Sequence, residues 1–204
     1  DLISNRILEG QLVPGAIINL RTLSAELGVS ISPIRDALWK LESEGSVVIE
    51  ANRKMYINKL SLDEVSEIFD LRLLLETKIL KESCDNKTTE SIEQAKEYLA
   101  LMDKNIDSPK NYLIANSNFH FYLYSMSHSQ ISLHIIKELW GKTAPYYSLH
   151  ITTSYDCQID MPHHTTMLKA FIQNDKKLLA KALHNDIMGS KKFITSLLKK
   201  NNSG

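Results

Sequence analysis

The sequence predicts a mainly α-helical protein, with a winged helix-turn-helix domain in residues 1–60 and an all-helical antiparallel bundle in residues 61–204. In residues 1–60, short apolar segments alternate with glycine and proline, which is typical of small elements joined by tight turns. From residue 61 onward these breaks nearly disappear, and long segments carry apolar residues at helical spacing. With 43% hydrophobic residues and only 7 glycines and 5 prolines, the chain has the composition of a folded protein.

The first two elements are expected to be helices. A short N-terminal helix should end near Gly10. A second helix is expected over residues 20–27, because Asn19 can accept hydrogen bonds from its first N–H groups. Gly28 can then adopt the left-handed conformation that ends a helix.

A third helix and a hairpin should follow. Ser32 followed by Pro33 is typical of an N-cap and a first helical residue, so we expect the third helix to run from there to about Ser43. Residues 46–50 and 55–58 have the pattern of two strands joined by a short turn. Two helices, a turn, a third helix and a hairpin together indicate a winged helix-turn-helix.

The remaining residues are expected to form one helical domain. Ser61 and Glu64 have the spacing of a capping box, which marks where its first helix begins. The expected helices cover about residues 62–83, 88–106, 109–127, 129–153, 161–173 and 175–199.

Charge and cysteine content exclude several other classes of protein. The 24 Lys and Arg residues balance the 24 Asp and Glu residues, so net charge gives no sign of nucleic acid or membrane binding. No apolar run is long enough for a membrane span. Cys84 and Cys157 lack the CxxC spacing of a zinc site, which favours a reducing, cytoplasmic setting. Because the chain opens at Asp1 without Met, some upstream residues are expected to be missing.

DNA binding is predicted from the positions of particular side chains. Ser30, Ser32 and Arg35 lie at the N-terminal end of the third helix, where backbone N–H groups can also meet a phosphate. The guanidinium of Arg35 can bind guanine O6 and N7. The alternative is a surface ion pair between Arg35 and an acidic neighbour. Phosphate contacts are expected from three basic side chains: Lys40, Arg53 and Lys54.

Residues 23–45 carry a specific resemblance, since they read LSAELGVSISPIRDALWKLESEG. This run resembles the DNA-binding domain of GntR-family transcriptional regulators, whose pattern is LA-x-x-LGVSRTPVREAL-x-x-L-x-x-EGLV. Ile31 departs from it where a DNA-contacting Arg is usual, and Lys54 stands where the wing usually has Gly. The resemblance implies a regulator, expected to be a repressor, that binds a palindromic operator in double-stranded DNA as a homodimer.

Polar side chains on apolar helix faces predict a second site. Asn116 and His120 lie one turn apart and both point inward, His164 lies on the apolar face of a later helix, and Asp186 lies within the buried stripe of the last one. An ionised Asp in an apolar bundle costs several kcal/mol unless it is paired or binds a metal. A divalent cation bound by all four residues would satisfy them together, and a hydrogen-bonded network is the alternative.

The helical domain also resembles a known class. Residues 70–76, DLRLLLE, resemble the R-x-x-x-E opening of FadR-type effector domains of the FCD class. Such domains commonly bind a metal through a D-x-x-x-H helix, a later His and a final His. Asn116 and His120 match the first pair, His164 matches the third ligand, and Asp186 replaces the final His. The resemblance implies a divalent metal, Zn, Ni or Mn, in a shell richer in oxygen.

Three functions are compatible with these residues. The first is a DNA-binding regulator whose helical domain binds a metal and a small organic acid. The second is a metalloenzyme that activates water with the same four residues, which leaves residues 20–58 without a role. The third is a metal-free helical sensor. We favour the regulator and expect no enzyme. The expected effector-binding residues are Arg72, for which pairing with Glu76 is the alternative, together with Tyr146, Tyr147 and His150.

Overall fold

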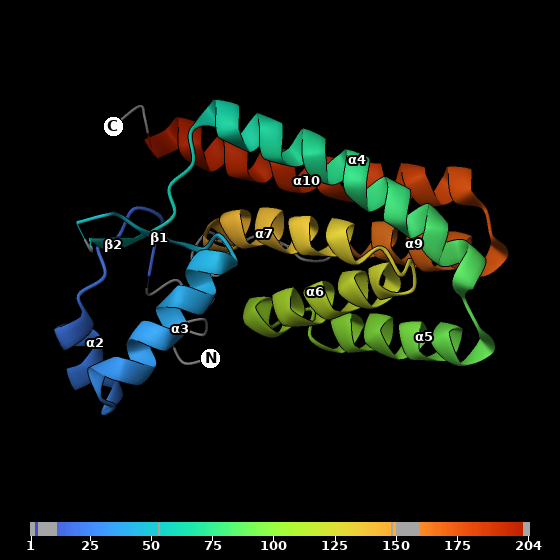
Figure 1. Cartoon of the computed structure of the whole chain (residues 1–204). Helices are drawn as coiled ribbons and strands as arrows, with labels where there is room; N and C mark the ends of the chain where they lie inside the picture. Colours follow the sequence, from blue (N-terminus) through green and yellow to red (C-terminus); the bar gives the residue numbers. More distant parts are fainter. Residues whose placement is uncertain (1–2, 4–11, 53, 148, 150–159, 202–204) are drawn as a thin grey trace. The chain divides into compact units, whose positions relative to one another are not determined.

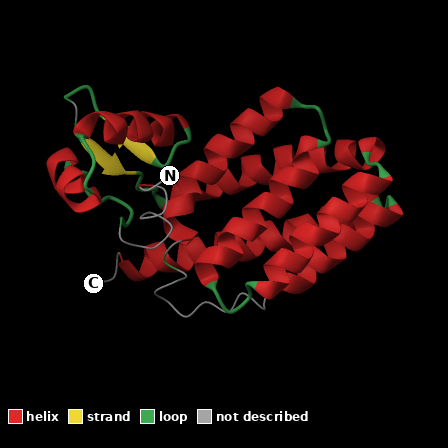
Figure 2. Ribbon diagram, turned by 90° about the horizontal axis from the view of Figure 1, so that it is seen from below, coloured by secondary structure: helices red, strands yellow, loops and turns green. Residues whose placement is uncertain are grey.

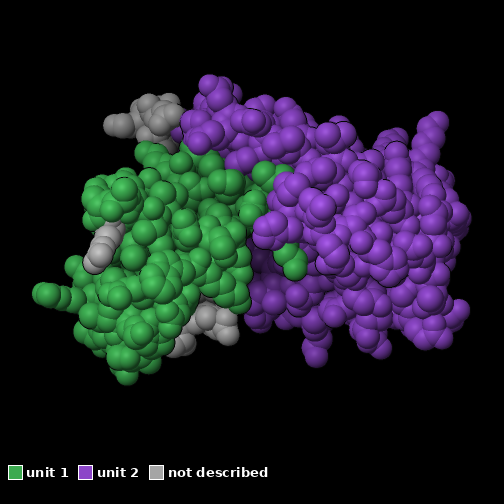
Figure 3. All heavy atoms as spheres, in the orientation of Figure 1, with its two compact units in different colours: residues 1–60, 137–154 green, residues 61–136, 155–204 purple. Residues whose placement is uncertain are grey.

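A computed structural model describes residue 3 and residues 12–52, 54–147, 149 and 160–201 (Figure 1). The chain divides into two compact units (Figure 3). Unit 1 contains residues 1–60 and 137–154, and unit 2 contains residues 61–136 and 155–204.

Residues 12–52 and 54–60 of unit 1 form two helices followed by a two-stranded antiparallel hairpin: α2 (Leu20–Leu27), α3 (Ile31–Ser43), β1 (Val47–Ile49) and β2 (Met55–Ile57). The hairpin pairs Val47 with Ile57. Asn19 caps α2, because its side-chain oxygen accepts from the N–H groups of Arg21 and Thr22. Gly28 ends this helix at φ 66°, in the left-handed region. The predicted winged helix-turn-helix is confirmed.

The start of α3 differs from the prediction. The N-cap is Ser30 rather than Ser32, and the helix begins at Ile31. Pro33 therefore occupies the third helical position rather than the first. A proline is tolerated there because the N–H groups of the first helical turn have no partner within the helix.

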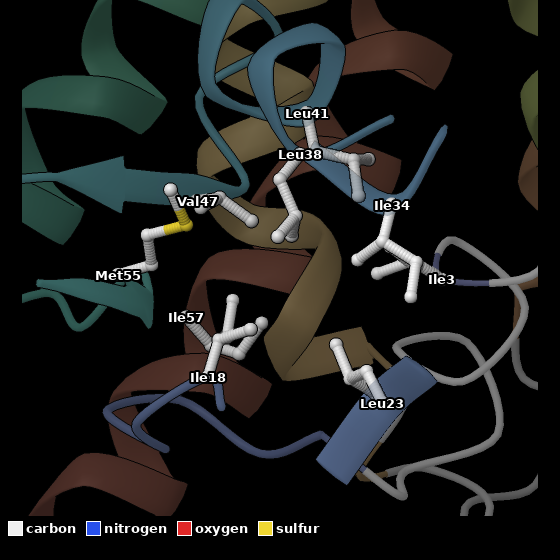
Figure 4. Close-up of a cluster of buried hydrophobic side chains, with 9 residues drawn as sticks. All are labelled: Ile3, Ile18, Leu23, Ile34, Leu38, Leu41, Val47, Met55 and Ile57. Carbon is white, nitrogen blue, oxygen red and sulfur yellow. The ribbon is translucent and has the colours of Figure 1, made fainter. Parts of the chain in front are cut away.

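The core of unit 1 is apolar and draws on α2, α3 and both strands of the hairpin (Figure 4). Its buried side chains come from the N-terminal segments, both helices and both strands: Ile3, Ile18, Leu23, Ile34, Leu38, Leu41, Val47, Met55 and Ile57. Helix α3 contributes Ile34, Leu38 and Leu41 to this core, and its half-buried Ala37 packs against it.

The second half of helix α7 (Gln130–Tyr147) packs with unit 1, which the sequence did not indicate. Gly141 approaches the turn after α3 so closely that an added Cβ would lie 1.5 Å from the carbonyl oxygen of Glu44. The Ser46 hydroxyl donates to the Gly141 carbonyl at 2.9 Å, and the Leu60 N–H donates to the Tyr146 hydroxyl at 2.6 Å. Only glycine allows this contact at position 141.

Unit 2 is built from helices throughout its described residues (Figure 2). Its described helices are the first half of α7 together with α4 (Leu62–Asn86), α5 (Thr89–Lys104), α6 (Pro109–Ser125), α9 (Met161–Gln173) and α10 (Lys176–Asn201). Helix α10 packs against α4 and α9, and α5 packs against α6. The capping box at Ser61 and Glu64 is confirmed by reciprocal hydrogen bonds of 3.2 and 2.7 Å. None of the described helices combines the length and apolar character that a membrane span requires.

Candidate metal centre and DNA-binding surface

Three helices of unit 2 bring two imidazoles and a carboxylate together. His120 comes from α6, His164 from α9 and Asp186 from α10, and all three are buried. The two Nε2 atoms are 3.0 Å apart, and they lie 3.5 Å (His120) and 3.3 Å (His164) from the Asp186 carboxylate. Metal–ligand bonds of about 2.0–2.2 Å place neighbouring ligand atoms roughly 3–3.5 Å apart. The spacing of the three groups therefore fits a single divalent ion.

The outer nitrogen of each imidazole has its own hydrogen-bond partner. His164 Nδ1 lies 2.9 Å from the carbonyl oxygen of Asp160, which can only accept, so this nitrogen carries the proton. His120 Nδ1 lies 2.9 Å from the hydroxyl of Tyr124, which itself donates to Glu76 at 2.6 Å. The hydroxyl therefore accepts from His120. In neutral imidazoles both Nε2 atoms then present lone pairs to each other, an arrangement that a cation between them would satisfy.

A buried ion pair continues this chain of contacts. Arg72 Nε donates to Glu76 at 2.7 Å, and both side chains are nearly inaccessible to water. The pairing that the sequence offered as an alternative role for Arg72 is therefore present. The guanidinium also lies 5.1 Å from the ring of Phe69. Glu76 thus links the Arg72 cation to Tyr124 and, through it, to His120.

Burial sets the protonation of the three central groups. It lowers the pKa of His120 well below its usual value, and the charges of His164 and Arg72 lower it further. Burial also lowers the pKa of His164, although the hydrogen bond to Asp160 opposes this. Burial raises the pKa of Asp186 to about 7, and the positive charge of Arg72 opposes the rise. Neutral imidazoles are the form that binds metals.

Asn116 adds a fourth polar atom to the same part of α6. Its Oδ1 is buried and has no hydrogen-bond partner among the described residues. A buried carbonyl oxygen without a partner is costly, and binding a cation would satisfy it. Together with the two imidazoles and the carboxylate, the donor set fits a divalent metal.

The other predicted residues of the helical domain lie elsewhere. His184 is exposed and His163 is half-buried, and neither belongs to the buried group of possible metal ligands. Tyr146 and Tyr147 belong to unit 1, where the Tyr146 hydroxyl accepts from Leu60. His150 lies outside the described residues.

Sequence reasoning missed Tyr124 and the backbone carbonyl of Asp160 as partners of the central imidazoles. Tyr124 follows His120 by four residues, and that spacing could have indicated the contact. Asp160 likewise precedes His164 by four residues, but a backbone carbonyl leaves no mark in the sequence.

The predicted DNA-contacting side chains lie on the surface of unit 1. Ser30, Ser32, Arg35, Lys40 and Lys54 are exposed, and Arg53 lies outside the described residues. No described acidic residue forms an ion pair with Arg35, so its guanidinium is available to a ligand.

Two family matches cover most of the chain. Residues 1–57 match the family described as "Bacterial regulatory proteins, gntR family". Residues 67–188 match the family described as "FCD domain". The second match includes all four proposed metal-binding residues.

The chain is also similar to individual proteins. It is 27% identical over 199 residues to the gluconate operon transcriptional repressor of Bacillus licheniformis, covering 90% of this chain and 79% of that protein. It is 28% identical over 127 residues to the Nta operon transcriptional regulator of Aminobacter aminovorans, covering 62% of this chain and 60% of that protein. The solved structure of Escherichia coli McbR/YncC has the same fold, with a TM-score of 0.83 at 20% identity, covering 95% and 93% of the two chains.

Proposed function

Because the chain belongs to the GntR family of bacterial regulators and carries an FCD domain, we propose that it is a sequence-specific DNA-binding repressor controlled by a metal-dependent small-molecule site. Residues 1–60 are assigned to DNA binding, and residues 61–204 to the effector domain. The family is one of transcriptional regulators rather than enzymes.

DNA recognition is assigned to the N-terminal end of α3. The assignment is supported by the exposed, unpaired guanidinium of Arg35 on the same helix end as Ser30 and Ser32. Arg35 would bind guanine in the major groove, while Lys40, Lys54 and Arg53 would contact phosphates.

The Arg35→Ala variant tests this assignment. Affinity for the operator should fall by about 1–3 kcal/mol, whereas affinity for random DNA should change little. Binding of both duplexes is measured by fluorescence anisotropy, with Glu26→Ala, an exposed residue of α2, as the control. Equal losses on operator and random DNA would show that Arg35 contacts only phosphate.

The operator is expected to be a palindrome bound by a homodimer. One recognition helix covers only a half-site, and two-fold protein symmetry matches two-fold operator symmetry. Light scattering of the chain, alone and with a duplex that contains two half-sites, measures how many chains associate in each case. A monomer that binds a single half-site as tightly as the full operator would contradict it.

The metal is assigned to Asn116, His120, His164 and Asp186. The observation that carries this assignment is the 3.0 Å approach of two Nε2 atoms whose Nδ1 partners are both fixed. A bound divalent ion would supply positive charge at the centre and open positions for further oxygen ligands. The donor set, with two nitrogens and two oxygens, favours Zn, Ni or Mn.

Metal analysis tests this site directly. The purified chain, incubated with Zn²⁺, Ni²⁺ or Mn²⁺ and desalted, should retain one ion per chain. His164→Ala should retain none, whereas His163→Ala, its half-buried neighbour, should bind as the wild type does. Equal retention by the two variants would exclude the site.

A small organic acid is the proposed effector. The positive charge of Arg72 lowers the pKa of both His120 and Asp186. A carboxylate bound at the metal would therefore also be attracted to this guanidinium. Because Glu76 already holds Arg72, an entering acid would compete with Glu76 for it. A supporting role for Tyr146, Tyr147 and His150 stays a prediction from the sequence, because the two tyrosines belong to unit 1 and His150 lies outside the described residues.

Calorimetric titration of candidate acids tests the switch. An effector that lowers operator affinity tenfold requires about 1.4 kcal/mol of differential binding between the two states. By reciprocity, the operator must weaken the binding of the acid by the same factor. An acid that binds equally well with and without operator is not the effector.

A further inference from the structure

A hollow of about 330 Å³ lies on unit 1 beside helix α3. Its lining residues come from the first residue of α2, from α3 and from both strands of the wing: Leu20, Arg35, Trp39, Ile49 and Met55. Four of these five side chains are apolar, and the fifth is the guanidinium proposed to read the operator. Met55 also belongs to the apolar core of this unit, so the hollow adjoins packed side chains (Figure 4).

Trp39 is the most unusual of the lining residues. It is 52% exposed, although tryptophan is among the side chains that gain most from burial. Ser32, Arg35 and Trp39 follow one another at intervals of three and four residues, so they lie on one face of α3. Single exposed apolar residues are common on protein surfaces. Trp39 differs because it lines a hollow on the face assigned to DNA.

The guanidinium of Arg35 supplies the positive charge of the lining. Arg21, which follows Leu20 on α2, is exposed and adds a second positive charge near this end of the helix. Lys54 lies on the other face of the hairpin from Met55, because its ammonium is 5.9 Å from the ring of Tyr56. An occupant that brings an apolar group into the hollow and negative charge close to it matches this arrangement.

We infer that the hollow receives the methyl group of a thymine in the operator and that Trp39 is the side chain that contacts it. This inference rests on the proposed binding of DNA by α3. The thymine methyl is the apolar group that the major groove presents, and the phosphates on either side carry the negative charge. Trp39 is therefore a specificity-determining residue, and each operator half-site contains a thymine close to the guanine bound by Arg35.

The experiment begins with duplexes selected by the full chain from a random pool. The selected half-site should contain a guanine whose preference is lost in Arg35→Ala and a nearby thymine whose preference is lost in Trp39→Ala. Deoxyuridine, which lacks only the methyl group, then replaces that thymine. Wild-type affinity should fall about fourfold, as expected for one buried methyl group. Trp39→Ala should bind the two duplexes equally.

Two further variants make the test specific. Trp39→Phe keeps an apolar ring but has no indole N–H, so it should retain the preference for thymine over deoxyuridine. Loss of that preference in Trp39→Phe would overturn the inference in favour of a hydrogen bond from the indole. Ile17→Ala is the matched control, because Ile17 is 68% exposed in the same unit and does not line the hollow. It should bind as the wild type does.

The outcomes separate the two proposals. If the wild type selects a sequence but Trp39→Ala discriminates thymine from deoxyuridine as well as the wild type does, this inference is overturned and DNA binding by α3 stands. If the wild type selects no sequence at all, the proposed function itself fails.

Discussion

The two polar regions of this protein differ in how their side chains are held. Arg35, on the face of unit 1 that we propose binds DNA, is exposed and has no ion-pair partner among the described acidic residues. His120, in the centre of unit 2, is fully buried, and both of its ring nitrogens are engaged. A change on the exposed face can therefore alter binding with little effect on folding. A change in the buried centre should alter stability together with the proposed metal binding, because its neighbours lose a partner that water cannot replace.

The largest effect is expected from Asp186→Ala. The change removes the only carboxylate among the proposed ligands, so the variant should lose metal-dependent stabilisation completely. The wild type should gain about 2.7 kcal/mol when free metal is a hundredfold above its dissociation constant. Thermal unfolding with and without Zn²⁺ measures both, with His184→Ala, an exposed residue of the same helix, as the control. If Zn²⁺ raises the unfolding temperature of Asp186→Ala as much as that of the wild type, the buried carboxylate is not needed for metal binding. The buried centre would then not couple stability to metal binding as described.

Gly141→Ala should have the next largest effect, at the contact between α7 and the turn after α3. A Cβ there would lie 1.5 Å from the Glu44 carbonyl oxygen, so the backbone must move. We expect a loss of about 1–3 kcal/mol in the free energy of unfolding by urea. Gly189→Ala is the matched control, because its Cβ would meet nothing closer than 3.9 Å. As an alanine within α10, it should be neutral or stabilising by up to about 1 kcal/mol. Equal stability of the two variants would show that the contact at Gly141 adapts freely.

Tyr124→Phe should weaken the metal site without removing a ligand. The phenol oxygen fixes His120 by accepting a hydrogen bond from its Nδ1–H group, and loss of such an outer partner typically costs 10- to 100-fold in metal affinity. Competition with a chromophoric chelator measures the Zn²⁺ affinity. Tyr122→Phe is the control, since Tyr122 is half-buried and packs against Tyr98. If Tyr124→Phe binds Zn²⁺ as tightly as the control, the buried network does not orient the ligand.

Lys40→Ala should have the smallest effect. Its ammonium lies 3.9 Å from the carboxylate of Glu44 on an exposed helix face, so the pair should contribute no more than about 1 kcal/mol to stability. Operator and random DNA should both bind slightly less tightly, and the slope of affinity against salt should fall by about one. Salt titrations measured by anisotropy provide the slope. A loss confined to the operator would make Lys40 a base-reading residue.

Local patterns in the sequence were sufficient to predict the helices and the wing of the described residues, whereas the helix expected to end near Gly10 lies outside them. The capping box at Ser61 and the glycine stop at Gly28 are defined by a few adjacent residues, so their structures follow from local chemistry. The start of α3 was misplaced because Ser30 and Ser32 can both act as an N-cap. The inward direction of His120, His164 and Asp186 also followed from helical periodicity, because that periodicity fixes which face of each helix is buried.

Tertiary packing decided what these groups contact. Periodicity shows that three side chains point inward but cannot show that they meet, because they come from helices separated by as many as 66 residues along the chain. The same holds for the Tyr124 and Glu76 contacts and for the packing of Gly141 on the turn after α3. Sequence by itself determined the family, the elements and the faces they bury, since these depend on neighbours along the chain. The contacts between elements depend on how the helices pack, and only the folded structure provides that.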